Sequence, residues 1–209
     1  MEQHKIIIVD DHQLFRNGLK FILNEMKGVS VVGEASNGKE FLDLLEYGLP
    51  DLVLMDINMP VMNGVNATRI ALQKYPELNI LVLSMYGETE YYNTMIDLGV
   101  KGFILKDIDN KELEESIEKV ISGGTYFSQE LLLNLIKNKT VDENITLTRR
   151  EKEVLELICK GFSNQQISEK LFISQRTVER HRSSLLLKTD SKNSISLVVY
   201  AIKHKLISI

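Results

Sequence analysis

Three carboxylates, a hydroxyl and an ammonium group follow short apolar runs of this sequence. They are Asp10, Asp11, Asp56, Ser84 and Lys106. Carboxylates held close together repel one another, and a divalent cation with oxygen ligands, such as Mg2+, removes that conflict. A cation beside a lysine can also neutralise the charge of a transferring phosphoryl group. The set therefore predicts a Mg2+-dependent site of phosphoryl transfer.

Each side chain of the set has a distinct expected role. Asp56, which follows the third apolar run, is the candidate nucleophile and would form an aspartyl phosphate. Lys106 would pair with one phosphate oxygen, and Ser84 could hydrogen-bond another. Any one of these residues alone would be an ordinary polar group at a loop. The prediction depends on all of them following strands.

The elements that position these residues alternate along residues 1–123. Short runs rich in Val, Ile and Leu predict strands at 5–9, 29–34, 51–55, 79–84 and 102–105. Helical segments are expected near 12–26, 37–47, 63–75, 88–98 and 109–122. Such alternation indicates a parallel sheet covered by helices on both faces, whose strands share one carboxyl edge. We therefore predict an α/β fold, a (βα)5 doubly wound parallel sheet.

A specific set of motifs accompanies this pattern. It consists of Asp10-Asp11, the segment 55–60 with Gly64, then Ser84, Phe103 and Lys106. With these residues, positions 1–123 resemble a bacterial response-regulator receiver domain. The resemblance implies that Asp56 accepts a phosphoryl group from a phosphohistidine of a sensor histidine kinase.

The same resemblance implies the metal ligands and a switch. Mg2+ would be bound by Asp11, Asp56 and the backbone carbonyl of Asn58, with Asp10 helping through water. Ser84 and Phe103 resemble the switch pair, in which the hydroxyl moves toward the phosphoryl group and the ring turns inward. Phe103 could alternatively be an ordinary core aromatic, because Phe is often buried.

From residue 146 onward the pattern is helical throughout. Capping boxes at 148–151 and 163–166 predict the starts of two helices, and Ser174 can cap a third over about 175–188. A fourth helix begins after Asn193. The short second helix, a tight turn and the longer third helix form a helix-turn-helix candidate at 164–188. This part is therefore predicted to be a small all-α four-helix domain.

The outer face of the third helix carries side chains that suit DNA. These residues are Arg176, Glu179, Arg180 and Ser183. Arginine can bond guanine in a bidentate way, and glutamate can accept a hydrogen bond from cytosine. Asn164, Thr177 and Lys188 could hold phosphates.

This region also resembles a known family. The motifs that carry the likeness are Leu147–Glu151, Gly161–Asn164, Ile167, Leu171–Ser174, Thr177–His181 and Leu206-Ile207. They are similar to the LuxR/NarL (FixJ) type of helix-turn-helix. The resemblance implies base contacts from Glu179, Arg180 and Ser183. It also implies dimerisation through the fourth helix near Val198 and Ile202.

Charge and composition agree with this division. The 209 residues carry a net charge of -4, but residues 1–140 have 13 basic and 21 acidic side chains, whereas 141–209 have 12 and 8. The basic second part suits nucleic acid. The apolar runs are strand-sized, so we expect no membrane span, no signal peptide and a cytoplasmic protein. The single cysteine excludes an intramolecular disulfide.

The sequence thus predicts a receiver domain at 1–123, a linker at 124–145 with a helix at about 129–138, and a DNA-binding domain at 146–209. The expected function is a transcriptional regulator of a two-component system, not an enzyme, switched by phosphorylation of Asp56. Its expected partners are a sensor histidine kinase, double-stranded DNA and Mg2+. Two alternatives remain: a regulator that does not use phosphate, and an aspartyl-nucleophile phosphatase, which Asn58 disfavours because it stands where a second aspartate would act.

Phosphorylation at Asp56 lies far along the chain from the third helix of the tail. The signal must therefore travel through domain contacts or assembly. We expect the acidic first domain to hold the basic tail and cover its third helix, and the phosphorylated protein to form a homodimer.

Overall fold

The computed structural model describes residues 3–85, 89–127, 145, 147–204 and 206–207. Its first part alternates strands and helices, as predicted. The strands are β1 (His4–Val9), β2 (Val29–Ala35), β3 (Leu52–Asp56), β4 (Ile80–Ser84), β5 (Gly102–Leu105) and β6 (Tyr126–Phe127). The helices are α1 (Gln13–Glu25), α2 (Gly38–Leu45), α3 (Gly64–Lys74), α4 (Thr89–Leu98) and α5 (Asn110–Ile121). We call this part the α/β domain.

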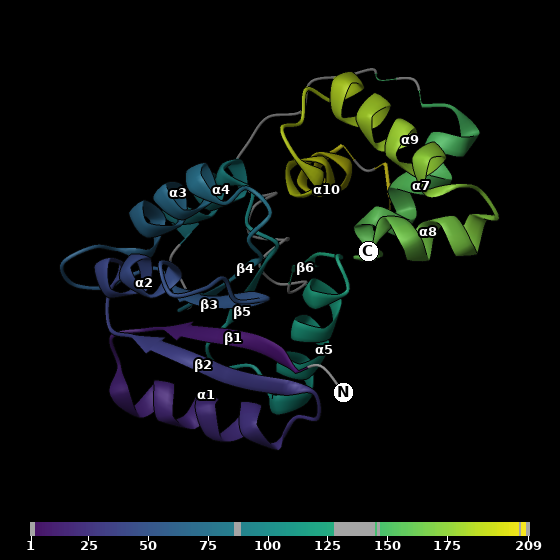
Figure 1. Cartoon of the computed structure of the whole chain (residues 1–209). Coiled ribbons are helices and arrows are strands. Elements are labelled where there is room, and N and C mark those ends of the chain that lie inside the picture. Colours follow the sequence, from purple (N-terminus) through teal and green to yellow (C-terminus); the bar gives the residue numbers. More distant parts are fainter. Residues whose placement is uncertain (1–2, 86–88, 128–144, 146, 205, 208–209) are drawn as a thin grey trace.

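All neighbouring strands of the sheet are parallel, in the order β2-β1-β3-β4-β5-β6. Successive strand residues point to opposite faces, so the sheet separates two apolar cores. Ile8 and Leu54 pack with residues of α1 and α5, whereas Val9 and Met55 pack with residues of α2, α3 and α4. These two groups of helices lie on opposite faces of the sheet (Figure 1). The doubly wound α/β prediction is confirmed.

The strand order reverses direction between β1 and β3. In such sheets, ligands bind outside the carboxyl ends of the strands at this topological switch point. Asp10 and Asp11 directly follow β1, and Asp56 is the last residue of β3. The fold therefore brings the predicted carboxylates to one edge of the sheet.

The sixth strand, β6, was not predicted. It pairs in parallel with β5, with Gly102 opposite Tyr126 and Phe103 opposite Phe127. The Tyr126 hydroxyl donates to Glu112 of α5 at 2.8 Å. The sheet therefore extends to residue 127, past the predicted domain end at 123. The helix predicted at about 129–138 lies outside the described residues.

The second part of the chain is helical, and we call it the helical domain. Its helices are α7 (Arg149–Cys159), α8 (Asn164–Leu171), α9 (Gln175–Lys188) and α10 (Ser194–Lys203). Thr148 and Ser163 begin α7 and α8 with the predicted capping boxes, and Ser174 caps α9. The turn between α8 and α9 passes through Phe172 in the left-handed conformation, with φ 53°. These helices form a helix-turn-helix, as predicted.

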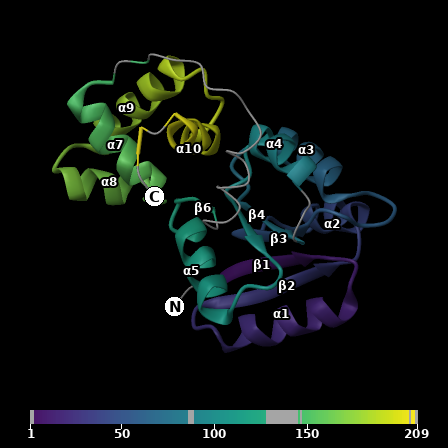
Figure 2. The same cartoon turned by 180° about the vertical axis from the view of Figure 1, so that it is seen from behind.

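Helix α10 lies between the rest of the helical domain and α4 of the α/β domain, as both views show (Figures 1 and 2). On the side that faces the helical domain, α10 packs Leu197, Val198 and Ala201 into the core of that domain. In the described part of the chain, no helix has the length and apolar character needed to cross a membrane.

Candidate functional site

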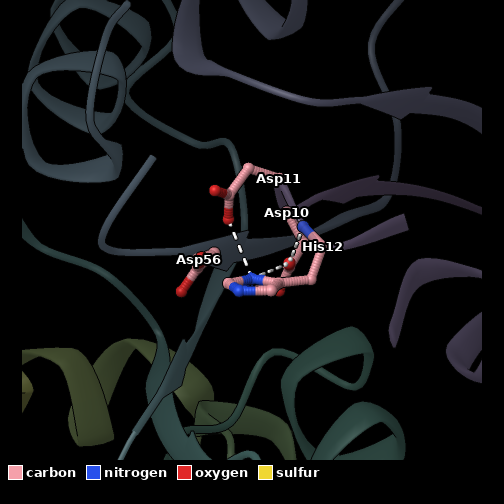
Figure 3. A group of neighbouring side chains, drawn as sticks. All are labelled: Asp10, Asp11, His12 and Asp56. Carbon is pink, nitrogen blue, oxygen red and sulfur yellow. Dashed lines mark hydrogen bonds and ion pairs between the residues drawn. The ribbon is translucent and has the colours of Figure 1, made fainter. Parts of the chain in front are cut away.

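The predicted phosphoacceptor pocket assembles at the carboxyl edge of the sheet. Lys106 places Nζ 2.7 Å from Asp10 Oδ2 and 2.9 Å from Asp56 Oδ1. Asp10 and Asp56 are both buried, whereas Asp11 is partly exposed. Figure 3 shows the side chains of Asp11, His12 and Asp56 close together, with Asp10 largely behind His12. Four of the predicted residues are therefore neighbours.

Burial governs the charge of the central carboxylate. It raises the pKa of Asp56 to about 6, although the ammonium group of Lys106 acts in the opposite direction. The negative charge of Asp10 adds to the rise. Burial also opposes the charge on Lys106, but its contacts with Asp10 and Asp56 prevail and raise the pKa of its ammonium group. A lysine that remains charged thus bridges two buried carboxylates.

The loop after β3 holds Asp56 in place through its backbone. Asp56 Oδ1 accepts a hydrogen bond of 2.8 Å from the Ile57 amide, and Gly64 donates to the Ile57 carbonyl at 2.8 Å. A Cβ on Gly64 would lie 1.9 Å from the Asp56 carbonyl oxygen, so only glycine fits there. This is the physical reason for the glycine noted in the motif.

The pocket can accommodate a divalent cation. Asp10 Oδ2 and Asp11 Oδ1 are both buried; Asp10 Oδ2 pairs with Lys106 at 2.7 Å, and Asp11 Oδ1 lies 2.9 Å from His12 Nδ1. The candidate ligand atoms of Asp10, Asp11, His12 and Asp56 all lie within 4.8 Å of one another. Carboxylate oxygens in this number suit Mg2+, which keeps several waters. Asn58, the source of the predicted carbonyl ligand, lies two residues after Asp56.

The two predicted switch residues occupy neighbouring strands. Ser84 ends β4, in register with Leu105 of β5; its side chain lies outside the described part. Phe103 is fully buried, with its ring centroid 5.4 Å from that of Tyr92 and 5.9 Å from that of Phe127. Phe103 is therefore a core aromatic that also touches the strand leading out of the α/β domain.

Sequence reasoning missed two neighbours of this pocket. His12 places Nδ1 2.9 Å from Asp11 Oδ1, and the ring of Phe15 lies 5.1 Å from Lys106 Nζ. A hollow of about 450 Å³ opens beside them. It is lined by His12, Leu14, Phe15, Met85, Lys106 and Asp107. Their positions in the sequence could have indicated both residues, because His12 adjoins the aspartate pair and Phe15 is about one helical turn further on.

The predicted base-reading face of α9 is open. Its residues Arg176, Glu179, Arg180 and Ser183 are all exposed. Leu187, on the same face, is 84% exposed. The expectation that the first domain covers this helix is therefore wrong: the contact falls on α10, at the other side of the helical domain. Charge asymmetry alone could not predict which helix the α/β domain contacts.

The three predicted phosphate contacts already have partners within the helical domain. Asn164 accepts a hydrogen bond of 2.7 Å from Arg182, and Thr177 contacts the Ser174 hydroxyl at 2.8 Å. Lys188 places Nζ 2.7 Å from Oε2 of Glu151. These contacts give the residues a structural role beside any contact with DNA.

The buried carboxylate of Glu151 joins the first and third helices of the domain. It contacts Lys188 and accepts hydrogen bonds from Ser184 and from the amide and hydroxyl of Thr148. Burial opposes its charge, but these partners prevail and lower the pKa of Glu151 to about 2.

The predicted dimer contacts lie inside the helical domain. Val198 is 1% exposed and Ile202 is 8% exposed, both within its core. The side of α10 that faces the α/β domain instead carries Ile195, which packs with the core of that domain, and Val199, which packs against both cores. A surface for a second copy on α10 would therefore use Ile195 and Val199.

Polar contacts complete the interface between the domains. Asn193 donates from Nδ2 to the Ile96 carbonyl at 2.6 Å, and Lys192 lies 2.7 Å from Asp97. Phe127 of β6 packs against both cores. A small cavity of about 50 Å³ at this seam is lined in part by Phe127, Cys159 and Val198.

The backbones also approach closely beside β6. A Cβ on Gly124 would lie 2.2 Å from the Gly161 carbonyl oxygen, and one on Gly161 would lie 2.4 Å from the Thr125 carbonyl oxygen. Gly161 adopts φ +79°, a conformation that favours glycine. The segment after α5 thus rests directly on the turn that ends α7.

Two family models match the chain. Residues 6–118 match the response regulator receiver domain, and residues 145–201 match the bacterial regulatory proteins of the luxR family. The chain is 39% identical over 220 residues to the transcriptional regulatory protein DegU of Brevibacillus brevis, covering 96% of this chain and 93% of that protein. It is 36% identical to the oxygen regulatory protein NreC of Staphylococcus carnosus, covering 97% and 99%.

A solved structure extends the similarity to the whole architecture. The RcsB response regulator of Salmonella typhimurium, studied for its conformational dynamism in DNA interaction, matches with a TM-score of 0.61 and 25% identity, covering 97% of this chain and 99% of that one. The receiver and helix-turn-helix resemblances are both confirmed. The chain therefore belongs to the LuxR-type two-component response regulators, in which a receiver domain is joined to a DNA-binding helix-turn-helix domain.

Proposed function

We propose that this protein is a transcriptional regulator switched by phosphorylation of Asp56 by a sensor histidine kinase. The observation that carries the proposal is the bridge of Lys106 between the buried carboxylates of Asp10 and Asp56. A carboxylate oxygen of Asp56 attacks phosphorus, so that an O–P bond forms while the N–P bond of the phosphohistidine breaks. Lys106 neutralises charge on the transferring group.

Mg2+ would be held by Asp11, Asp56 and the Asn58 carbonyl, with Asp10 acting through water. When bound, it supplies positive charge to the phosphoryl oxygens. The phosphoryl donor would approach over the hollow beside Lys106, whose apolar residues Leu14 and Met85 are exposed.

Mass measurement tests this part of the proposal. The full-length chain, treated with acetyl phosphate and Mg2+, should gain the mass of one phosphoryl group. Asp56→Asn should gain none, because the amide is nearly isosteric but a poor nucleophile. Incorporation at the wild-type level in Asp56→Asn would refute Asp56 as the acceptor. No incorporation in a folded wild-type chain would favour the phosphate-independent alternative.

The proposed output is binding of double-stranded DNA through α9. Arg180, Glu179 and Ser183 would contact base edges from the face that also carries Arg176, and Thr177 would lie near the phosphate backbone of the DNA. One recognition helix offers few base contacts, so two copies on a two-fold axis would read half-sites about 10 bp apart. The role of the chain is regulation, and its own chemistry is limited to gaining and losing the phosphoryl group.

We infer that the receiver controls assembly by holding α10. In the closed arrangement, the Ile195 and Val199 side of α10 packs against the α/β domain and cannot meet a second copy. Phe103 lies in β5, the strand that leads to Lys106, and its ring contacts the ring of Phe127 at this interface. A movement of Ser84 and Phe103 upon phosphorylation would loosen the contact of Phe127 and release α10 for homodimerisation.

A further inference from the structure

A largely buried arginine lies behind the carboxylate pocket. Arg16, in the first turn of α1, donates from Nη1 to the backbone carbonyl of Asp10 at 2.5 Å. Its side chain is only 14% exposed. The bond meets the main chain where β1 passes into the pocket, because Asp10 directly follows that strand. The proposed phosphoacceptor chemistry gives this guanidinium group no role.

An ion pair does not account for the position of Arg16. Its Nε is 3.9 Å from Oε2 of Glu34, the limit for an ion pair, and this buried Nε donates no hydrogen bond within the described part of the chain. Lys20, one turn later on α1, pairs with Glu34 at 2.5 Å. An unsatisfied buried donor costs free energy, so the fold sacrifices a bond to Nε while it keeps the bond from Nη1 to Asp10.

The carbonyl that Arg16 holds belongs to the peptide unit between Asp10 and Asp11. Because a peptide unit is planar, fixing this carbonyl also fixes the nitrogen of Asp11, from which the direction of its side chain follows. A charged donor makes the bond about twice as strong as a neutral one would. Asp11 has the greatest need of such support, since it is partly exposed whereas Asp10 and Asp56 are buried.

We propose that Arg16 is a positioning residue for the Mg2+ ligands of the pocket. It holds the Asp10–Asp11 peptide so that the carboxylate of Asp11 points into the pocket before a cation binds. Residues that fix metal ligands in this way typically contribute 10- to 100-fold to metal affinity. Arg16 bonds the main chain and not the reacting carboxylate, so it should act on cation affinity and not on the reactivity of Asp56. The inference rests on the Mg2+ site of the proposed function.

Calorimetric titration of the full-length chain with Mg2+ tests this role. Arg16→Gln removes the charge and most of the reach, and we expect it to bind Mg2+ about tenfold more weakly than wild type. Its phosphorylation by acetyl phosphate should be slow at limiting Mg2+ and should return to the wild-type rate at saturating Mg2+. Unchanged Mg2+ affinity would overturn the proposal. A rate that stays low at saturating Mg2+ would overturn it as well, because a merely structural defect is not corrected in this way.

Arg16→Lys keeps a charged donor of shorter reach and also serves if Arg16→Gln does not fold. It should bind Mg2+ more weakly than wild type but more tightly than Arg16→Gln. Wild-type affinity in Arg16→Lys would mean that positive charge alone suffices, and this would overturn the role of the bond to Asp10.

The other members of the charge cluster on α1 and β2 provide matched controls. Lys20→Gln removes the second cation beside Glu34, and Glu34→Gln removes the acid itself, but both leave the bond from Arg16 to Asp10 in place. Both variants should bind Mg2+ as wild type does. A loss in either that equals the loss in Arg16→Gln would contradict the proposal, because the ion pairs would then set the affinity.

The same titrations separate this inference from the proposed function. If wild type does not bind Mg2+, the proposed Mg2+ site fails, and the role of Arg16 fails with it. If wild type and a folded Arg16→Gln bind Mg2+ equally well, the role of Arg16 alone is refuted and the proposed site stands.

Discussion

Asn193 donates a hydrogen bond of 2.6 Å from Nδ2 to the carbonyl of Ile96, and this bond joins the start of α10 to the last turn of α4. The same side chain accepts hydrogen bonds from the Ile195 and Ser196 amides as the N-cap of α10. The residue that begins the proposed dimerisation helix is therefore also the residue that fastens it to the receiver. Assembly and domain docking use one element of the protein.

The ion pair beside Asn193 allows the docking to be weakened without loss of the cap. Asp97→Lys would place two positive charges together at the interface. An exposed pair contributes at most about 1 kcal/mol, so we expect a roughly twofold to fivefold rise in the DNA affinity of the unphosphorylated protein. Electrophoretic mobility shift assays measure this change.

Charge exchange is the control for that variant. Adding Lys192→Asp to Asp97→Lys should return the affinity toward the wild-type value, because opposite charges face each other again. Glu46→Lys disrupts an exposed ion pair with Lys74, away from the interface, and should have no effect. Equal affinities for all these proteins would mean that the Lys192–Asp97 contact does not restrain the helical domain.

Phe127 should transmit the state of the receiver to α10. Phe127→Ala removes the ring that contacts Phe103 and both cores. We expect the unphosphorylated variant to form more dimer than wild type, and phosphorylation to change its assembly less. Sedimentation velocity with and without acetyl phosphate measures both effects. Phe21→Ala, at a ring that is 69% exposed on α1, is the control for loss of a phenyl group. A wild-type response in Phe127→Ala would exclude this ring from the coupling.

The raised pKa of Asp56 predicts how stability depends on pH. Its ordinary pKa of 3.8 rises to about 6 in the fold, so the folded carboxylate costs about 3 kcal/mol once it is ionised. The cost is fully present above pH 6, shrinks as pH falls from 6 to 4, and is absent below. Without Mg2+, Asp56→Asn should therefore be more stable than wild type at pH 7.5.

Urea unfolding of the receiver transition at pH 7.5 and at pH 4.5 measures this difference. The stability gap between Asp56→Asn and wild type should be smaller at pH 4.5. Mg2+ should narrow it at pH 7.5, because the cation offsets the buried charge. A stability difference that does not change with pH, or an Asp56→Asn protein that is less stable than wild type at pH 7.5, would contradict burial as the cause of the raised pKa of Asp56.

Two neighbouring arginines of α9 should behave differently when replaced. Arg180 is exposed on the proposed base-reading face, so Arg180→Ala should cost about 1–3 kcal/mol of discrimination between DNA sequences and leave stability unchanged. Arg182 donates to Asn164 and Ser194, which ties α9 to the starts of α8 and α10. Arg182→Ala should therefore destabilise the helical domain. Specificity profiling measures the loss of discrimination, and thermal unfolding measures the loss of stability. If Arg182→Ala lost discrimination and Arg180→Ala lost stability instead, α9 would be oriented differently on DNA.

Lys188 illustrates how the structure changes an expectation. As a phosphate contact alone, it would affect only DNA affinity and its salt dependence. Its pairing with buried Glu151 means that Lys188→Ala should also lower the stability of the helical domain by about 1–3 kcal/mol. Lys188→Arg, which keeps the charge, should retain most of that stability. Equal unfolding midpoints for Lys188→Ala and wild type would show that the ion pair contributes little.

Local rules predicted the elements and the pocket well, since strand-sized apolar runs, capping boxes at Thr148 and Ser163, and polar residues at strand ends are all local signals. The missed features depend on contacts between distant segments. β6 has only two residues and a sequence that shows no strand period. Val198 and Ile195 are both apolar residues of α10, and only packing decides which one faces its own domain and which faces the receiver. His12 stood beside the aspartates, but its direction depends on the backbone at the start of α1.

The reactivity of Cys159 tests the central claim most directly, because it is the only cysteine of the chain and lines the cavity between the domains. Burial raises the pKa of its thiol to about 12, so it should react slowly with a disulfide reagent while the domains are docked. We predict that acetyl phosphate with Mg2+ accelerates labelling several-fold in wild type and leaves the rate unchanged in Asp56→Asn. An unchanged rate in wild-type protein that carries the phosphoryl group by mass would contradict the release of α10 by phosphorylation.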